Sequence, residues 1–197
     1  MARPSVIDPN QVLDAAELLV REGGIASLTI GEVAKAAGVS KGGVQSCFGT
    51  KDNLIQAMYE RWSLEFDDQV HSLAGDEPGG LHIIAAHTEA TRATDGMQAD
   101  RAAGLMTALL NVDTLRQPTR DWYRARMDLV DPSTEQGRRA RLAFLATEGA
   151  FLLRSFGFLA MEEEEWQSIF ADIQTLLVVD GKDGKDGKDS TEQSAPG

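Results

Sequence analysis

Residues 28–54 have the sequence LTIGEVAKAAGVSKGGVQSCFGTKDNL, and this stretch decides the fold. Thr29 and Glu32 have the spacing of a capping box, which predicts that a short helix begins there. Gly38 is expected to end this helix, because glycine readily adopts the left-handed conformation that closes a helix. Ser40 can cap a second helix that begins at once. The stretch is therefore predicted to be a helix, a tight turn and a second helix.

The second helix is predicted to have an apolar inner face and a polar outer face. Helical spacing turns Val44, Cys47 and Phe48 largely inward. The outer face then holds Lys41, Gly42, Gln45 and Ser46. A helix fits the major groove of DNA, where its N-terminal residues can contact base edges. We therefore expect the outer face to be the surface that is available to DNA.

The stretch resembles the DNA-binding signature of the TetR/AcrR family of transcriptional regulators, and the similarity extends from about Asp8 to Trp62. The resemblance implies a dimeric, ligand-responsive repressor that a small molecule releases from a palindromic operator. It also implies phosphate contacts from Thr29, Ser40 and Lys51. The full set of residues expected at the DNA is Thr29, Gly31, Ser40, Lys41, Gly42, Gly43, Gln45, Ser46, Cys47 and Lys51.

Several positions depart from the family's pattern. The family usually has Thr where this chain has Gly43, Tyr where it has Gln45, and an aromatic residue or His where it has Cys47. Recognition is therefore expected to depend on Lys41 and Gln45, since lysine can bind guanine and glutamine can bind adenine. Gly42 and Gly43 each cost roughly 1 kcal/mol of helix propensity. The substitution Gly43→Ala is accordingly expected to tighten this helix.

Cys47 is the only cysteine, which excludes an internal disulfide and a cysteine-rich zinc site. Its place in the second helix allows a redox switch, although a small half-buried residue is the simpler interpretation. His71, His82 and His87 lack metal-like spacing and are expected to be ordinary surface or core residues. The sequence shows no nucleophile paired with a base and no phosphate-binding loop. Neither an enzyme nor a cofactor is therefore indicated. The remaining alternative is a helical adaptor that does not bind DNA.

The composition suits one or two helical domains with a buried core, since 42% of the 197 residues are hydrophobic. No apolar run has the length of a signal peptide or a membrane span, so a cytoplasmic location is expected. The net charge is −12, but residues 1–62 carry six Lys/Arg and seven Asp/Glu, whereas residues 63–197 carry thirteen and twenty-four. The acidic part is therefore expected to lie away from the DNA.

An all-α fold of about nine helices is predicted. Asp8 caps a first helix that ends at Gly23-Gly24, and Thr50 caps a fourth helix that extends to about Ala74. Further helices are predicted at 81–93, 99–112, 118–130, 133–157 and 162–178. The expected domains are a helix-turn-helix domain at 1–50, a helical ligand-binding and dimerisation domain at 51–180, and a disordered tail at 181–197.

The predicted helix at 133–157 is apolar on nearly all sides, so it must be covered on all sides. A symmetry-related copy can cover its outer face. By the family resemblance, a homodimer is expected through the helices at about 133–157 and 162–178. The carboxylates of Glu162 to Glu165 are expected to be stabilised by a helix dipole, not to bind a cation.

The resemblance also implies a pocket for an unknown small-molecule effector between the fourth helix and the helices that follow. Its candidate walls are Trp62, Phe66, Met106, Leu109, Trp122, Met127, Phe144 and Glu148. Each apolar member is also a typical core residue. Glu148 can face the pocket as the counter-ion of a lipophilic cation, or it can pair with Arg141 or Arg154. The second arrangement is the expected one.

Overall fold

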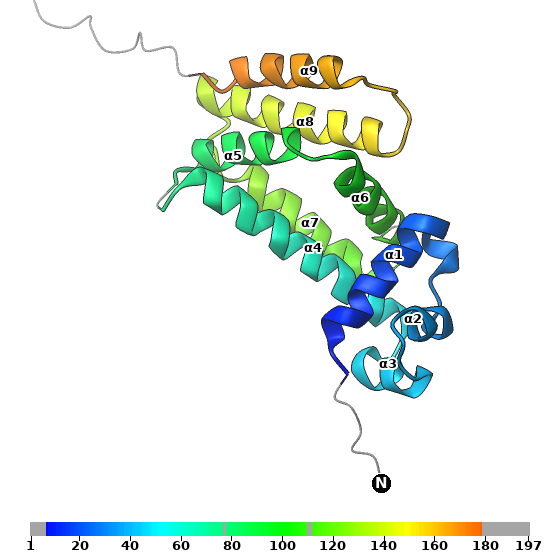
Figure 1. Ribbon diagram of the computed structural model, residues 1–197. Coiled ribbons are helices and arrows are strands. Elements are labelled where there is room, and N and C mark those ends of the chain that lie inside the picture. The colour runs from blue at the N-terminus through cyan, green and yellow to red at the C-terminus, as the bar shows by residue number, and fades with distance from the viewer. Residues whose placement is uncertain (1–6, 77, 110–111, 179–197) are drawn as a thin grey trace, which may run out of the picture.

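The computed structural model describes residues 7–76, 78–109 and 112–178, and the regular structure in these ranges is entirely helical. The all-α prediction is therefore confirmed. The predicted tail at 181–197 lies outside the described residues. The helices, drawn in Figure 1, are α1 (Pro9–Ser27), α2 (Ile30–Ala36), α3 (Lys41–Phe48), α4 (Lys51–Ala74), α5 (Gly80–Arg92), α6 (Gly96–Leu109), α7 (Asp113–Met127), α8 (Glu135–Ser155) and α9 (Glu163–Thr175).

The first four helices begin where the sequence predicts a cap. Asp8, Thr29, Ser40 and Thr50 each accept a hydrogen bond from a backbone N–H two or three residues later, over 2.9–3.2 Å. Gly38 has a φ of 67°, the left-handed conformation expected of the residue that separates α2 from α3. Local capping chemistry therefore fixes both ends of the tight turn.

Several helix boundaries differ from the prediction by one to five residues, and two of them involve a glycine or a proline. Gly24 has a left-handed φ of 68° that kinks the chain, but helical structure resumes beyond Gly23-Gly24 and continues to Ser27. The helix α7 begins at Asp113, earlier than predicted, and includes Pro118. Proline removes one backbone hydrogen bond from a helix, which is why it suggested a boundary.

One apolar core joins α1, α2 and α3 to the first half of α4. Its fully buried members are Val12, Ala16, Leu28, Val33, Val44, Leu54 and Met58. Burial of each large side chain contributes about 1.5–3 kcal/mol. Leu105 of α6 and Leu115 of α7 reach the same core. The helix-turn-helix is thus packed against the rest of the chain, not tethered to it.

Cys47 is exposed, which corrects the prediction that it points inward. The helix α3 has only eight residues and packs through Val44, which is buried, and Phe48, which is half-buried. Cys47 lies beside this narrow line of contact, on its solvent side. The thiol therefore belongs to the same exposed surface as Gln45 and Ser46.

The helix α4 runs from the helix-turn-helix towards the other end of the molecule, where α5, α8 and α9 lie together (Figure 1). Trp166 and Phe170 of α9 are buried there against Phe151 of α8 and Ala102 of α6. In the described ranges, no helix is both long enough and apolar enough to cross a bilayer.

The two glycines at the start of α3 differ in the space around them. A Cβ atom on Gly43 would lie 2.1 Å from Ile7 Cδ1, whereas one on Gly42 would meet nothing within 4 Å. Gly42→Ala is therefore expected to raise the free energy of unfolding by about 0.4–1 kcal/mol. Gly43→Ala, which the sequence favours, is expected to gain less because Ile7 must turn away. Equal gains by both variants in urea unfolding would contradict this account.

Candidate DNA-binding surface and ligand cavity

The outer face of α3 is exposed, as its spacing predicts. The exposed residues are Lys41, Gly42, Gln45, Ser46 and Cys47, and Gly43 is half-buried. Ser40 Oγ accepts the Gly43 N–H at 3.0 Å, which leaves the hydroxyl proton free to donate. Hydroxyl donors of this kind commonly bind phosphate oxygens. The structure thus brings polar and basic groups together on one surface at the end of the molecule.

The other residues expected at DNA have different surroundings. Thr29 and Gly31 are exposed at the start of α2, where the Thr29 hydroxyl accepts the Glu32 N–H at 3.2 Å. Lys51 is half-buried, and its Nζ donates to Ile25 O at 3.2 Å. In this arrangement Lys51 connects the end of α1 to the start of α4.

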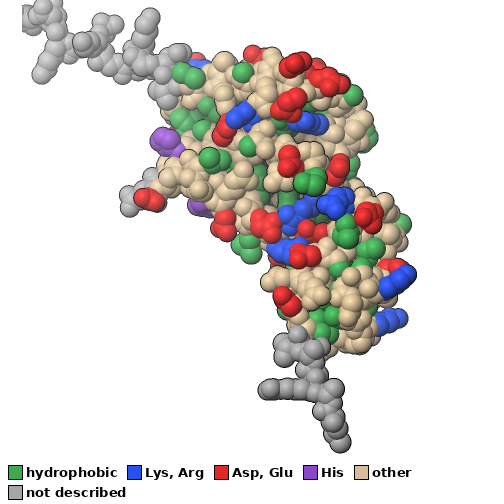
Figure 2. Space-filling model, in the orientation of Figure 1, with side chains coloured by type: hydrophobic (Ala, Val, Ile, Leu, Met, Phe, Trp, Pro, Cys, Tyr) green, Lys and Arg blue, Asp and Glu red, His purple; other side chains and the backbone are tan. Residues whose placement is uncertain are grey.

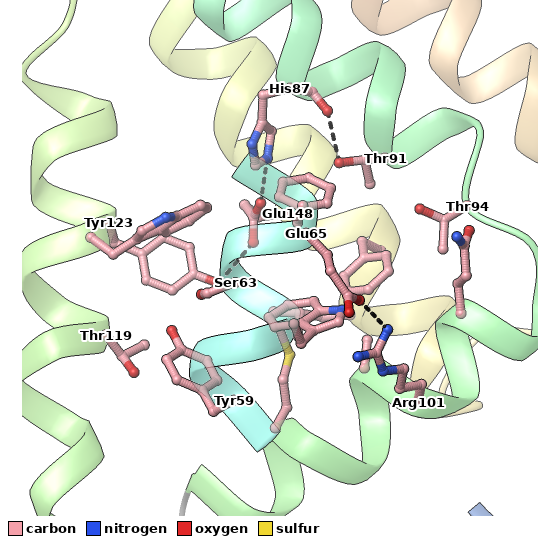
Figure 3. A pocket seen from close by; sticks show the side chains of 18 of the residues that line it. Tyr59, Ser63, Glu65, His87, Thr91, Thr94, Arg101, Thr119, Tyr123 and Glu148 are labelled. Carbon is pink, nitrogen blue, oxygen red and sulfur yellow. Dashed lines mark hydrogen bonds and ion pairs between the residues drawn. The ribbon is translucent and has the colours of Figure 1, made fainter. Parts of the chain in front are cut away.

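A cavity of about 370 Å³ lies between α4, α5, α6, α7 and α8 (Figure 3). Five of the predicted wall residues line it, and these are Trp62, Phe66, Met106, Trp122 and Glu148. Met127 and Phe144 do not line it, because they pack beside Ile84 and Ala140 in the core behind the wall. Leu109 falls where no side chain is described.

Glu148 does not pair with Arg141 or Arg154, so that prediction is wrong. Its Oε1 accepts from Nε2 of His87 at 2.7 Å, and its Oε2 accepts from the Tyr123 hydroxyl at 2.8 Å. Arg154 instead pairs with the start of α9, and Arg141 lies two helical turns before Glu148. Glu148 therefore faces the cavity with two partners that belong to other helices.

Several cavity residues were not predicted, and Tyr123 and His87 matter most among them because they bond to Glu148. Burial, and then the Glu148 carboxylate, raise the pKa of Tyr123 well above its ordinary value, so the phenol stays protonated and donates. His87 is only 1% exposed and is surrounded by aromatic rings. His87, Thr88 and Thr91 occur together on the buried face of α5. Such a polar stripe in an apolar helix is a signal, since buried polar groups need partners.

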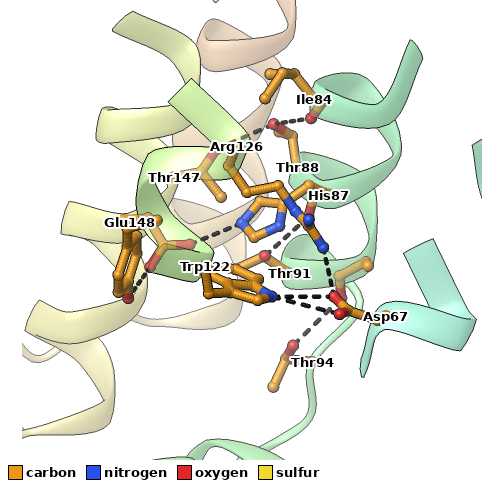
Figure 4. A network of polar contacts seen from close by, with 12 residues as sticks. Asp67, Ile84, His87, Thr88, Thr91, Thr94, Trp122, Arg126, Thr147 and Glu148 are labelled. Atoms are coloured by element: carbon orange, nitrogen blue, oxygen red, sulfur yellow. Dashed lines mark hydrogen bonds and ion pairs between the residues drawn. The ribbon is translucent and has the colours of Figure 1, made fainter. Parts of the chain in front are cut away.

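Figure 4 shows how polar contacts hold the wall of the cavity. Arg126 of α7 donates to Asp67 of α4 at 2.5 Å, and the Trp122 indole N–H donates to the same carboxylate at 3.3 Å. The guanidinium of Arg126 also lies 4.6 Å from the Trp122 ring centroid. Thr88 and Thr147 are hydrogen-bonded at 3.1 Å between α5 and α8. The contacts with Asp67 and Arg126 hold Trp122 in place.

An ionic junction joins the cavity to α1; we define it as Asp14, Glu17, Arg61, Glu65 and Arg101. Glu17 of α1 lies 2.7 Å from Arg61 of α4 and 2.7 Å from Arg101 of α6. Arg101 also lies 2.6 Å from Glu65, and Glu65 and Arg101 both line the cavity. Figure 2 shows acidic and basic side chains gathered near the middle of the molecule.

The junction is partly buried. Burial alone lowers the pKa of Arg101, but its bonds to Glu65 and Glu17 raise that pKa on balance, so the guanidinium stays charged. The helix α6 also lies close to α1, because a Cβ atom on Gly104 would be 2.7 Å from Val20 Cγ1. The helix α6 therefore contacts the cavity on one face and α1 on another.

The helix α8 has an uncovered apolar strip. Leu142, Leu145 and Leu153 are 58%, 54% and 42% exposed. The helix α9 begins at Glu163, with three glutamates in its first turn, where the helix dipole stabilises negative charge. No group of three candidate metal ligands occurs among the described residues.

Comparisons with known proteins match both parts of the chain. The model described as bacterial regulatory proteins of the tetR family matches residues 12–58. The model described as the tetracyclin repressor-like C-terminal domain matches residues 82–178.

Solved structures share the fold. A member of the TetR family from Streptomyces coelicolor A3 is 23% identical, with a TM-score of 0.62 over 86% of this chain and 98% of that one. The multidrug binding protein EbrR, complexed with imidazole, is 21% identical, with a TM-score of 0.61 over 88% and 97%. NalD, the secondary repressor of the MexAB-OprM multidrug efflux pump in Pseudomonas aeruginosa, is 19% identical, with a TM-score of 0.55 over 87% and 96%.

The ionic junction predicts a difference between two carboxylates of α1. Glu17→Gln is expected to lower the free energy of unfolding by about 1.5–3 kcal/mol, the contribution of hydrogen bonds to charged groups. Asp14→Asn is the matched control: both carboxylates lie 2.7 Å from Arg61, but Asp14 is 72% exposed and Glu17 only 15%. An exposed pair contributes less than about 1 kcal/mol. Urea unfolding at pH 7 measures both losses, and equal losses would show that the buried junction has no special role.

Proposed function

The chain belongs to the TetR family of bacterial transcriptional regulators, and we propose that it is a dimeric repressor that leaves a palindromic operator when a small molecule fills its cavity. The observation that carries the proposal is the capped helix-turn-helix, whose second helix exposes Lys41 and Gln45. The family models and structural relatives belong to regulators, and we assign no catalytic activity to the chain.

In this proposal α3 lies in the major groove. Lys41 and Gln45 face base edges or the adjacent backbone, and Thr29, Ser40 and Lys51 lie near phosphates. We assign residues 1–50 to DNA binding and residues 51–180 to the effector and to dimerisation. A net charge of −12 opposes DNA binding overall, so a single copy binds weakly. Two copies on two half-sites then supply the affinity.

The dimer interface that we propose is formed by α8 and α9. The exposed leucines of α8 support it, because an apolar strip of this kind is a typical contact between protein subunits. A two-fold axis would place the apolar strip of one subunit against the same strip of the other subunit, so that each strip covers its partner. Gly149 and the exposed Ala146 lie on the same helix, and their small side chains permit close approach of two helices.

The cavity supports control by a ligand. Its volume of about 370 Å³ lies within the range of small-molecule sites, and its surface is mainly apolar. A ligand there would touch α6, which also contacts α1 through Arg101 and Leu105. We propose that it favours an arrangement of α1 and α6 that does not fit both half-sites. A ligand can shift such an equilibrium only by its difference in affinity for the two arrangements.

DNA contact by α3 predicts a change in salt dependence. Lys41→Ala is expected to lower the slope of log K against log salt by about 1 on mixed-sequence duplex DNA, because one phosphate contact is lost. Gln45→Ala is the matched control from the same exposed face, and it should leave the slope unchanged because it removes no charge. Fluorescence anisotropy measures both. Wild-type protein without salt-dependent binding would favour a helical adaptor that does not bind DNA.

The α8 interface predicts a change in oligomeric state. Leu145→Glu is expected to give monomers, because a carboxylate would be buried in each half of the apolar contact. Leu64 of α4 is 65% exposed and lies outside this strip, so Leu64→Glu is the control and should remain dimeric. Light scattering after size-exclusion chromatography measures the mass. A dimeric Leu145→Glu variant would place the interface elsewhere.

A further inference from the structure

Glu148 is a carboxylate whose charge is not balanced by an arginine or lysine. Its side chain is 14% exposed, and in the described part of the chain its one ion-pair partner is His87. Tyr123, its other partner, is a neutral donor. Arg101 also lines the cavity, but it is held by Glu17 and Glu65. The charge state of His87 therefore decides whether the carboxylate is neutralised.

The two ring nitrogens of His87 have different surroundings. Nε2 lies 2.7 Å from Glu148 Oε1, so Nε2 carries the proton that this bond needs. Nδ1 is buried without a hydrogen-bond partner. An imidazolium would leave a charged N–H donor there unpaired, which is far more costly than a bare ring nitrogen. The centroids of Phe66 and Phe144 lie 5.2 and 5.0 Å from the centroid of the imidazole ring, so apolar rings pack against His87.

Aromatic rings surround the space in front of this carboxylate. Trp62 and Phe66 are stacked with centroids 6.2 Å apart, and the rings of Trp122 and Tyr123 meet edge to face at 5.0 Å. All four line the cavity. Ring faces attract organic cations, and the attraction is strongest for tryptophan and where water is excluded. The cavity therefore combines the carboxylate of Glu148, which is 14% exposed, with four aromatic rings.

The other charges of the cavity do not favour an anion beside Glu148. Arg101 is neutralised within the ionic junction. Arg120 is exposed, and the exposed Arg116 lies 3.4 Å from Asp113 at the surface. Glu65 is 52% exposed and bonded to Arg101. The part of the cavity beside Glu148 is thus negative, and the more exposed charges of the lining are paired or solvated.

We propose that Glu148 is the counter-ion for a lipophilic organic cation, such as a quaternary ammonium or phosphonium ion with aromatic groups. The proposal rests on the function proposed above and names its class of effector. The cation's charge lies against Glu148, and its apolar groups fill the space between Trp62, Phe66 and Trp122. His87 and Tyr123 each donate a hydrogen bond to the carboxylate.

Two probes of the same shape and opposite charge test the proposal. Tetraphenylphosphonium and tetraphenylborate are titrated into the full chain by calorimetry, without DNA. The phosphonium is expected to bind at least tenfold more tightly than the borate. Equal affinity, or tighter binding of the borate, would overturn the proposal, and this comparison needs no variant that could fail to fold.

Three variants then locate the charge. Glu148→Gln keeps the shape of the side chain and is expected to weaken phosphonium binding at least tenfold. Glu60→Gln, the control at an exposed carboxylate of α4 outside the cavity lining, is expected to change it less than threefold. Tyr123→Phe removes a neutral donor and is expected to retain binding within threefold, since the charge remains. Unchanged affinity in Glu148→Gln would overturn the assignment of the counter-ion.

Failure of the proposed cation site can be distinguished from failure of the proposed function. Calorimetry reports the cation site without DNA, and the salt dependence of DNA binding reports α3 without a ligand. If the chain binds the phosphonium through Glu148 but does not bind DNA, the cation site is supported and the repressor function is contradicted. If the chain binds DNA but shows no preference for the cation, its role as a regulator is supported and this class of effector is contradicted.

Discussion

The carboxylate of Glu17 lies between the guanidinium groups of Arg61 and Arg101, 2.7 Å from each, and the arrangement of the two ends of the molecule depends on this contact. It connects α1 to α4 and α6, the two helices that border the cavity from that side. Apolar packing alone has no direction. Partly buried charges must be paired, so the junction restricts how far α1 can move against α6. The position of α3 follows, because α3 shares a core with α1.

In the proposed function, the same constraint links the cavity to the helix-turn-helix. Arg101 belongs to the ionic junction, Ala102 lines the cavity and Leu105 is buried in the core of the helix-turn-helix, all within two turns of α6. A molecule that repositions this part of α6 therefore acts on the support of the DNA-binding surface. The polar network around Asp67 holds the opposite wall, so a ligand is expected to move α6 more readily than α7.

The parts of the molecule that could be predicted from sequence are those that local chemistry determines. The caps at Thr29, Ser40 and Thr50 require only neighbouring residues, and all three occur as predicted. The partners of Glu148 could not be predicted, because they come from other helices whose rotation the sequence pattern does not fix. For the same reason Phe144 lies behind the cavity wall, and Cys47 lies outside the narrow contact of α3. Helical spacing indicates which face is apolar, but not how much of that face a neighbour covers.

The central claim is that two copies of α3 bind DNA on one face. Footprinting of the wild-type chain on the DNA that flanks its own gene tests this most directly. The account predicts a protected palindrome whose half-sites are separated by about one helical turn of DNA or a multiple of it. The absence of any protected palindrome, at protein concentrations where the chain is dimeric, would contradict it.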